Sequence, residues 1–233
     1  MKNIVCIILA RGGSKTIPKK NLINFCGKPL LIWSIDQAKN TRNISSIWVS
    51  SDDDKILKFA KKNGVNIIKR PKSLSTSKSS SVSGWIHAIN YIEKNEKPID
   101  MVIALQATSP VREPKDIEKG IKIFFEKKLD SLFSAAIIGD FFIWEIKNSK
   151  YKSINYNYKK RPRRQEFPDQ YVENGSFYMF TPNLIKKNKN PIGKKIGISL
   201  MEFWKSFEID DFDDLLFLKI LMKNYLLKNN IPK

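Results

Sequence analysis

The sequence has 233 residues, of which 42% are hydrophobic, and its 42 Lys and Arg residues against 23 Asp and Glu give a formal net charge of +19. This hydrophobic share is enough for a packed core and excludes an intrinsically disordered chain, and the length suits one α/β domain. No run of about 18 apolar residues is present, and the first residues lack the cleavage pattern of a secretory signal. We therefore expect a cytoplasmic protein without a membrane partner.

The positive charge has two interpretations. Strongly basic chains are typical of nucleic-acid-binding proteins, but the lysines here are spread along the chain next to Asn and Ile. The sequence contains neither the aromatic and basic pattern of an RRM nor the ligand spacing of a zinc finger. We therefore expect a solvated lysine-rich surface and no nucleic-acid partner. A basic Rossmann-like nucleic-acid-binding protein without turnover is the alternative.

Strand and helix patterns alternate from the amino terminus, which predicts parallel βαβ units. The expected fold is α/β and Rossmann-like, with helices on both faces of a mostly parallel sheet. Strands are predicted at 4–10, 44–50, 65–69, 101–106, 131–138 and 172–180, with an edge strand at 197–199. Helices are predicted at 30–39, 53–63, 79–93, 114–128 and 211–227. Within these elements, Cys6 is interpreted as a core residue and His87 as a packed residue.

The alternation is interrupted over residues 139–169, a stretch that is rich in aromatic residues and ends in a basic run. Neither a strand period nor a helix period fits it. Aromatic surface of this kind between two sheet strands predicts an insertion that packs against another molecule. The alternative is a surface excursion that packs on its own chain. We expect a single domain over 1–233, with 139–169 as the insertion.

A glycine-containing loop follows the first predicted strand. Gly12 and Gly13 allow the backbone to bend so that its N–H groups face an anion. Arg11, Lys15 and Lys20 add positive charge at close spacing. The loop matches neither the GxxxxGK[ST] nor the GxGxxG phosphate-binding pattern. It is interpreted as a loop that binds a triphosphate, with a solvated surface turn as the alternative.

A resemblance to a known family begins in this loop, where 9–21 reads Leu-Ala-Arg-Gly-Gly-Ser-Lys-Thr-Ile-Pro-Lys-Lys-Asn. The string is similar to the amino-terminal signature of the CMP-sugar synthetases, the cytidylyltransferases that activate sialic, legionaminic and pseudaminic acids and Kdo. The resemblance continues in the same order through 27–30, 50–52, 105–112, 163–165, 173–178 and 207–210. It looks closest to the acylneuraminate cytidylyltransferase branch.

This resemblance implies a nucleotide-diphospho-sugar transferase fold and the transfer of CMP from CTP to an acidic α-keto sugar. It also implies Mg²⁺, or alternatively Mn²⁺, and a homodimer in which the insertion reaches the partner's active site. A nucleotidyltransferase for another base or sugar, such as Kdo, remains an alternative.

By position, the resemblance also assigns roles to individual residues. The nucleotide-binding residues are Ala10, Arg11, Gly12, Gly13, Ser14, Lys15, Asn21, Arg70 and Ser81, although Ser81 could instead cap a helix. Arg11, Lys20 and Asp210 are the catalytic candidates, with Lys20 as the charge clamp at the α-phosphate. The sugar-binding candidates are Gln106, Arg163, Arg164 and Asn174, and one of the two arginines is expected to meet the sugar carboxylate. Arg112 is interpreted as closing its own loop.

Two carboxylates near the carboxyl terminus are the candidate metal ligands. Glu208 and Asp210 alternate along a segment expected to be a strand, which would turn both side chains to one side. Hard oxygen donors at this spacing suit Mg²⁺. Asp211, Asp213 and Asp214 follow and could cap the last helix. The resemblance favours Asp210, and Glu208 is expected to act on the metal directly or through water.

Overall fold

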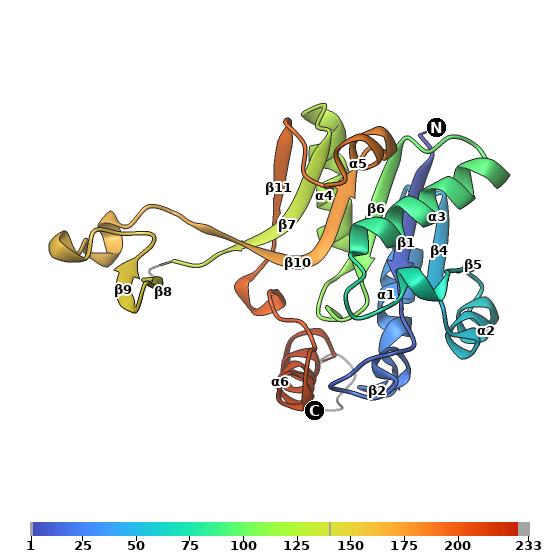
Figure 1. Ribbon diagram of the computed structural model, residues 1–233, viewed down its shortest axis with the longest axis horizontal. Coiled ribbons are helices and arrows are strands. Elements are labelled where there is room, and N and C mark those ends of the chain that lie inside the picture. Colours follow the sequence, from blue (N-terminus) through green and yellow to red (C-terminus); the bar gives the residue numbers. More distant parts are fainter. Residues whose placement is uncertain (1, 140, 228–233) are drawn as a thin grey trace.

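A seven-stranded sheet forms the centre of the computed structural model, which describes residues 2–139 and 141–227 (Figure 1). Its strand order is β11-β7-β10-β6-β1-β4-β5. The strands are β1 (Ile4–Leu9), β4 (Ser46–Ser51), β5 (Asn66–Lys69), β6 (Met101–Gln106), β7 (Ser131–Ile137), β10 (Tyr171–Phe180) and β11 (Ile196–Leu200). Every neighbouring pair is parallel except the two that involve β10. The predicted α/β fold with a mostly parallel sheet is confirmed.

Helices cover both faces of this sheet because side chains alternate along its strands. Ile4, Cys6 and Ile8 of β1 belong to an apolar cluster with α1 (Leu30–Lys39), α2 (Asp54–Lys62) and α4 (Pro114–Glu126). Val5 and Ile7 belong to a second cluster on the opposite face, with α3 (Ser81–Asn95) and α5 (Pro182–Asn188). Cys6 is fully buried, as expected for a core residue.

The helix ends follow the local sequence. Asp53 caps α2 by accepting hydrogen bonds from the N–H groups of Lys55 and Ile56, and Gly64, with φ +66°, follows that helix. Pro114 begins α4, where its missing N–H costs no hydrogen bond. The third helix begins at Ser81 and not at the predicted residue 79, because the hydroxyl of Ser80 accepts the N–H of Ser83 as its cap.

The antiparallel direction of β10 was not predicted. The described residues between β7 and β10, 138–139 and 141–170, contain no crossover helix, so the returning chain pairs beside β7 in the opposite direction. The ladder bulges between Glu173 and Tyr178, where Gly175 has φ +65°.

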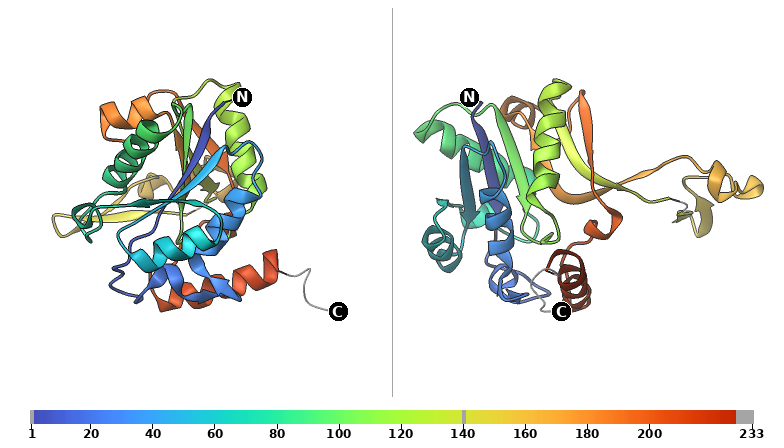
Figure 2. Two further views of the ribbon diagram at one scale, coloured as in Figure 1. Left: turned by 90° about the vertical axis from the view of Figure 1, so that its right-hand side faces the viewer. Right: turned by 180° about the vertical axis from the view of Figure 1, so that it is seen from behind.

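Residues 141–169 lie between β7 and β10 and extend away from the body as an arm (Figures 1 and 2). The arm carries the hairpin of β8 (Trp144–Lys147) and β9 (Lys150–Ser153). Phe142 packs against Tyr156 with ring centroids 4.5 Å apart, so the arm has a small aromatic centre of its own. Tyr151 nevertheless remains 76% exposed and Ile146 69% exposed.

The last helix packs against the first loops of the chain. It consists of α6 (Phe212–Leu221) followed by a π-helical turn (Met222–Leu226), and so ends one residue before the predicted 227. Ile209 and Leu218 share a third apolar cluster with Ile17 and with Phe25 of the hairpin β2 (Asn24–Phe25) and β3 (Lys28–Pro29). No helix in the described ranges is both long and apolar enough to cross a bilayer.

Candidate active site

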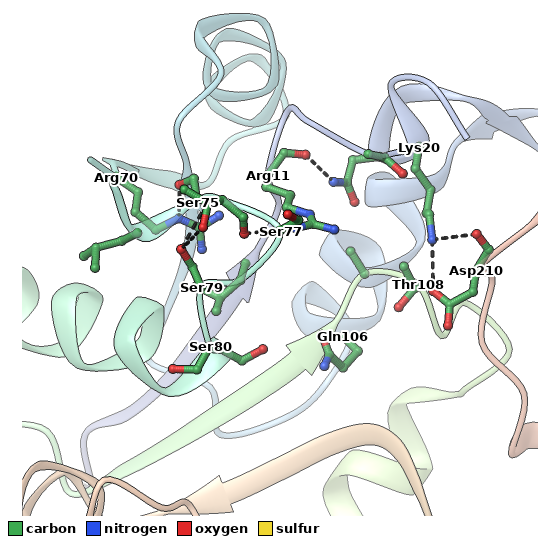
Figure 3. Close-up of a pocket in the computed structure, with 17 residues that line it drawn as sticks. Arg11, Lys20, Arg70, Ser75, Ser77, Ser79, Ser80, Gln106, Thr108 and Asp210 are labelled. Carbon is green, nitrogen blue, oxygen red and sulfur yellow. Dashed lines mark hydrogen bonds and ion pairs between the residues drawn. The ribbon is translucent and has the colours of Figure 1, made fainter. Parts of the chain in front are cut away.

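A pocket of about 380 Å³ lies at the carboxyl ends of the parallel strands (Figure 3). Open α/β sheets place their ligands at this edge. It is lined by eight of the residues predicted from the sequence: Arg11, Ser14, Lys20, Asn21, Arg70, Ser81, Gln106 and Asp210. The strand ends therefore bring together residues from nearly the full length of the chain.

The glycine loop forms one wall of the pocket. The Asn21 side chain donates a hydrogen bond to the carbonyl oxygen of Arg11 over 3.0 Å. Gly12 turns the other way: its N–H donates to Asp52 Oδ1 over 3.0 Å. The expectation that this N–H faces a bound anion is wrong, because a carboxylate of the chain itself occupies that direction.

The remaining predicted loop residues do not line the pocket. Ala10 is buried and its N–H continues the ladder of β1 by donating to the carbonyl oxygen of Ser50 over 3.0 Å. Gly13 and Lys15 are exposed. Of the residues from 10 to 15, only Arg11 and Ser14 therefore line the pocket.

Lys20 meets the carboxyl-terminal part of the chain in this pocket. Its ammonium donates to the carbonyl oxygen of Ile209 over 2.7 Å and lies 3.0 Å from Asp210 Oδ1 (Figure 3). The Lys20 side chain is only 11% exposed, whereas that of Asp210 is 71% exposed. A nearly buried cation at a polar pocket interacts more strongly with an anion than a solvated one does.

The strand predicted around Glu208 and Asp210 is absent. This segment has left the sheet after β11, and it is held instead by the N–H of Ile209, which donates to the carbonyl oxygen of Thr108 over 2.8 Å. Glu208 accepts a hydrogen bond from the Thr108 hydroxyl over 3.1 Å. Burial and the nearby charge of Asp210 raise the pKa of Glu208. The two carboxylates are thus close enough to repel each other.

These two carboxylates fit a hard divalent cation. The described ranges contain no group of three His, Cys, Asp or Glu side chains arranged to hold a metal. Mg²⁺, however, commonly takes only one or two protein carboxylates and completes its shell with water and substrate phosphates. Asp211 and Asp214 are not part of this pair, because they form the capping box at the start of α6. The capping alternative is confirmed for these two residues.

A serine-rich loop forms the opposite wall. Ser75, Thr76, Ser77, Ser79 and Ser80 line the pocket next to Ser81. Within 75–81, sequence reasoning assigned a nucleotide-binding role to Ser81 alone, although six of these seven residues carry hydroxyl groups. The Arg11 guanidinium donates to the carbonyl oxygen of Thr76 over 3.1 Å and so connects the two walls. Ser81 is exposed at the first position of α3 and is not its cap.

Arg70 lies below this loop and is only 5% exposed. Its Nε donates to the Ser75 hydroxyl over 2.8 Å. Burial lowers the pKa of Arg70, while the charge of Asp52 acts in the opposite direction. The half-buried His87 lies nearby, and burial together with the charge of Arg70 lowers its pKa, as suits a packed neutral histidine.

The sugar-binding candidates are not gathered in one place. Gln106 lines the pocket at the end of β6. Asn174 is buried, and its Oδ1 accepts hydrogen bonds from the Ser134 hydroxyl over 2.6 Å and from the N–H of Ser176 over 3.2 Å. Arg163 is exposed and does not line the pocket of its own chain. The side chain of Arg164 lies outside the described part of the structure.

Arg112 has the structural role expected for it. The guanidinium is 1% exposed and donates to the carbonyl oxygens of Gln106 over 3.0 Å and Ser176 over 2.8 Å. Burial lowers the pKa of Arg112 to about 10. It therefore closes the loop after β6 and ties that loop to β10.

Comparisons with known proteins agree on one family. Residues 5–229 match the family model described as cytidylyltransferase. N-acylneuraminate cytidylyltransferase A of Danio rerio is 34% identical over 197 residues, which cover 83% of this chain and 45% of that protein. Pseudaminic acid cytidylyltransferase of Campylobacter jejuni (strain 81-176) is 33% identical over 229 residues, which cover 96% of this chain and 97% of that protein. The chain thus spans less than half of the fish relative and nearly all of the bacterial one.

Solved structures show the same fold. The structure of CMP:2-keto-3-deoxy-manno-octonic acid synthetase complexed with CTP has a TM-score of 0.73 at 18% identity, covering 97% of this chain and 100% of that one. The 4-diphosphocytidyl-2C-methyl-D-erythritol synthase of Anaerococcus prevotii has a TM-score of 0.69 at 15% identity, covering 96% and 97%.

Proposed function

The chain belongs to the cytidylyltransferase family, and we propose that it transfers CMP from CTP to the anomeric hydroxyl of a nonulosonic acid, with release of pyrophosphate. The observation that carries this proposal is the convergence of Arg11, Lys20 and Arg70 with Asp210 on one pocket at the carboxyl edge of the sheet. The names of the N-acylneuraminate and pseudaminic acid relatives support the substrate class. The alternative of a nucleic-acid-binding protein without turnover is not favoured by the family match.

In the proposed reaction the sugar hydroxyl oxygen attacks the α-phosphorus of CTP. A new P–O bond forms, the bond to the β-phosphate oxygen breaks, and the hydroxyl proton is released. Arg11 and Ser14 would hold the triphosphate, since both face the pocket from the glycine loop. Lys20 would neutralise charge that grows as pyrophosphate leaves, and its low exposure makes this interaction stronger than it would be in bulk water.

The proposed metal ligands are Asp210 and Glu208, with Mg²⁺ as the cation and Mn²⁺ as an alternative. A divalent cation bound there would add positive charge next to the phosphates. The open side chain of Asp210 is suited to direct contact. The longer and more buried Glu208, which already accepts a hydrogen bond from Thr108, is suited to contact through water.

The proposed sugar site begins at Gln106 and is completed by a second subunit. Arg163 or Arg164 would come from the arm of the partner in a homodimer, and either would suit the sugar carboxylate as a bidentate donor. Large exposed apolar side chains on the arm support an interface between copies. We place the protein in the cytoplasm, in keeping with its two free cysteines, Cys6 and Cys26.

The decisive experiment is a panel of the four nucleoside triphosphates against several acidic sugars, with pyrophosphate release as the readout. We expect release only with CTP and only when a nonulosonic acid is present, with Kdo among the comparison sugars. Release with another triphosphate, or with Kdo alone, would contradict the proposed specificity. No release with any pair, together with binding to nucleic acid that falls steeply as salt rises, would support the alternative.

A further inference from the structure

The glycine loop separates the nucleotide pocket from a second cavity. Arg11 and Ser14 face the pocket described above. Gly12 instead lines a cavity of about 280 Å³ on the other side of the loop, together with Lys19 and the first turn of α2. The loop therefore separates the two cavities, and the positions of Arg11 and Ser14 depend on the contacts that Gly12 makes on the opposite side.

One peptide group in this wall is held at both polar ends. The carbonyl oxygen of Arg11 accepts a hydrogen bond from the Asn21 side chain over 3.0 Å. The N–H of the next residue, Gly12, donates to Asp52 Oδ1 over 3.0 Å. A peptide plane fixed at both ends has one orientation, and that orientation sets the direction in which the Arg11 side chain leaves the backbone.

Asp52 owes its position to the end of β4. The last paired strand residue before it is Ser51, which also accepts the N–H of Asp53 on its hydroxyl over 3.0 Å. Asp53 caps α2 and lies so close to Gly12 that a Cβ atom at Gly12 would be 2.7 Å from the Cβ of Asp53. The carboxylate of Asp52 is thus held between a strand end and a helix start.

The carboxylate of Asp52 reaches the loop at Gly12, on the side away from the nucleotide pocket. An acidic side chain near a triphosphate would repel it, but Asp52 approaches the loop through Gly12, which lines the far cavity. Its charge also acts to raise the pKa of Arg70, against the stronger effect of burial, which lowers that pKa. Asp52 therefore holds the wall that carries Arg11 through the N–H of Gly12.

We propose that Asp52 is a positioning residue of the nucleotide site, which acts through the N–H of Gly12 to fix the peptide that aims Arg11 at the triphosphate. This inference rests on the proposed use of CTP.

The test compares Asp52→Ala, Asp52→Asn and the control Asp54→Ala. Asp54 is two residues further on, exposed, and paired with Lys69 rather than with the loop. CTP binding is measured by calorimetry in Mg²⁺, and the KM values for CTP and for the sugar are measured alongside the thermal midpoint. Loss of a hydrogen bond to a charged acceptor should weaken CTP binding about tenfold or more in Asp52→Ala. Asp52→Asn keeps an oxygen acceptor and should stay within about threefold of wild type, as should Asp54→Ala.

A double-mutant cycle with Arg11→Ala measures how much of the effect of Asp52 on CTP binding acts through Arg11. If Asp52 acts by orienting Arg11, Asp52→Ala should change CTP affinity less than about twofold once Arg11 is already Ala. Fully additive effects would overturn the inference. The inference would also be overturned if Asp52→Asn weakened CTP binding as much as Asp52→Ala does, or if the KM for the sugar rose in parallel. Should Asp52→Ala fail to fold, Asp52→Ser takes its place, because its short side chain keeps a polar group but cannot reach Gly12.

The outcomes separate this inference from the proposed function. A wild-type protein that binds no CTP would refute the proposed function. If the wild-type protein binds CTP and the Asp52→Ala variant binds it with the same affinity, the proposed function stands and the role of Asp52 is refuted.

Discussion

The ammonium of Lys20 lies 3.0 Å from the carboxylate of Asp210, although 190 residues separate them in the chain. The third apolar cluster explains this proximity, because it packs Ile17, just before Lys20, with Ile209, just before Asp210. Buried apolar contacts therefore bring a cation and a candidate metal ligand to the same end of the pocket. The proposed phosphate clamp and the proposed metal site share one structural support.

Substitution of Lys20 tests the clamp. In Lys20→Ala we expect kcat to fall about a hundred- to a thousandfold, corresponding to roughly 2–4 kcal/mol, with a smaller rise in the KM for CTP. The reason is that Lys20 meets charge that grows toward the transition state. Steady-state kinetics measure both constants, and Lys19→Ala is the control because Lys19 is exposed and lines the cavity behind the loop. A change confined to KM would mean that Lys20 only anchors bound CTP.

Substitution of Asp210 tests the metal site. Asp210→Asn should abolish Mg²⁺-dependent turnover while the fold persists, because a neutral amide is a poor ligand for a hard cation. Glu208→Gln should cost less if Glu208 acts through water. Titration of activity with Mg²⁺ and with Mn²⁺ provides the measurement, and circular dichroism checks the fold. Asp213→Asn, a change in the first turn of α6, is the control. Unchanged Mg²⁺ dependence in Asp210→Asn would remove Asp210 from the metal site.

Gly12 and Gly13 provide a matched pair for the close approach behind the loop. A Cβ atom at Gly12 would lie 2.7 Å from the Cβ of Asp53, whereas one at Gly13 would meet no atom within 4 Å. Gly12→Ala should therefore lower the free energy of unfolding by about 1–3 kcal/mol, and Gly13→Ala should change it by less than about 0.5 kcal/mol. Chemical denaturation measures both. Equal stabilities would show that the loop can move away from α2 without cost.

The glycine loop and the alternating elements could be predicted because their signals are local. An apolar run followed by a glycine pair indicates a strand that runs into a loop, without knowledge of any distant contact. The direction of β10 was inaccessible, since a period of two is the same for parallel and antiparallel strands. The position of the serine loop opposite the glycine loop was not predicted, because it depends on Arg11 reaching Thr76 from another element.

Two misinterpretations have the same physical origin. The alternation of Glu208 and Asp210 suggested a strand, but an extended segment outside the sheet, held by hydrogen bonds to Thr108, produces the same alternation. The N–H of Gly12 was expected to face a ligand, and it faces Asp52. In both cases a tertiary hydrogen bond from a distant segment decides the outcome, and a single sequence does not show which segment supplies it.

The proposed shared site predicts complementation between inactive variants. Lys20→Ala and Arg163→Ala, refolded together, should regain up to about a quarter of wild-type activity, because random pairing makes half of the dimers mixed and each mixed dimer has one intact site. Arg164→Ala is tested in the same way. Mixing Lys20→Ala with Arg11→Ala is the control and should regain nothing, since both residues belong to one chain's pocket. A monomeric mass by light scattering with full activity would exclude the shared site.

A buried ion cluster around Lys205 predicts that the stability difference between wild type and Lys205→Met depends on pH. Lys205 is 1% exposed, and its ammonium lies 2.8 Å from Glu113, 2.9 Å from Asp116 and 2.8 Å from Glu202. Lys205→Met should lower the free energy of unfolding by about 3–5 kcal/mol at pH 7, because it leaves carboxylates without their partner. Lys186→Met, which breaks a more exposed pair with Glu93, should cost about 1 kcal/mol or less.

The pH dependence of that difference follows from the carboxylates. Burial acts to raise the pKa of Glu113 and Glu202, but hydrogen bonds and the charges of Lys205 and Lys115 together outweigh it and hold both pKa values below the ordinary range. A carboxylate whose pKa is lowered by folding stabilises the fold at pH values above its unfolded-state pKa, which is about 4.3 for Glu. This stabilisation is lost as the pH falls through the pKa of the folded state. The gap between wild type and Lys205→Met should therefore narrow below about pH 4 in urea denaturation. A gap that is constant from pH 7 to about pH 3 would contradict an electrostatic origin.

The two roots of the arm stand next to each other, since the N–H of Ile138 donates to the carbonyl oxygen of Gln170 over 3.1 Å where the chain leaves and returns. An excursion whose ends already meet can change in length at a small entropic cost, roughly 0.6 kcal/mol for each doubling. The arm is thus an exchangeable module: its sequence can diverge, or be replaced in a chimera, while the ladder of β7 and β10 stays intact. In the proposed homodimer, the interface and the partner's contacts with the sugar can in this way change independently of the proposed nucleotide site in the body.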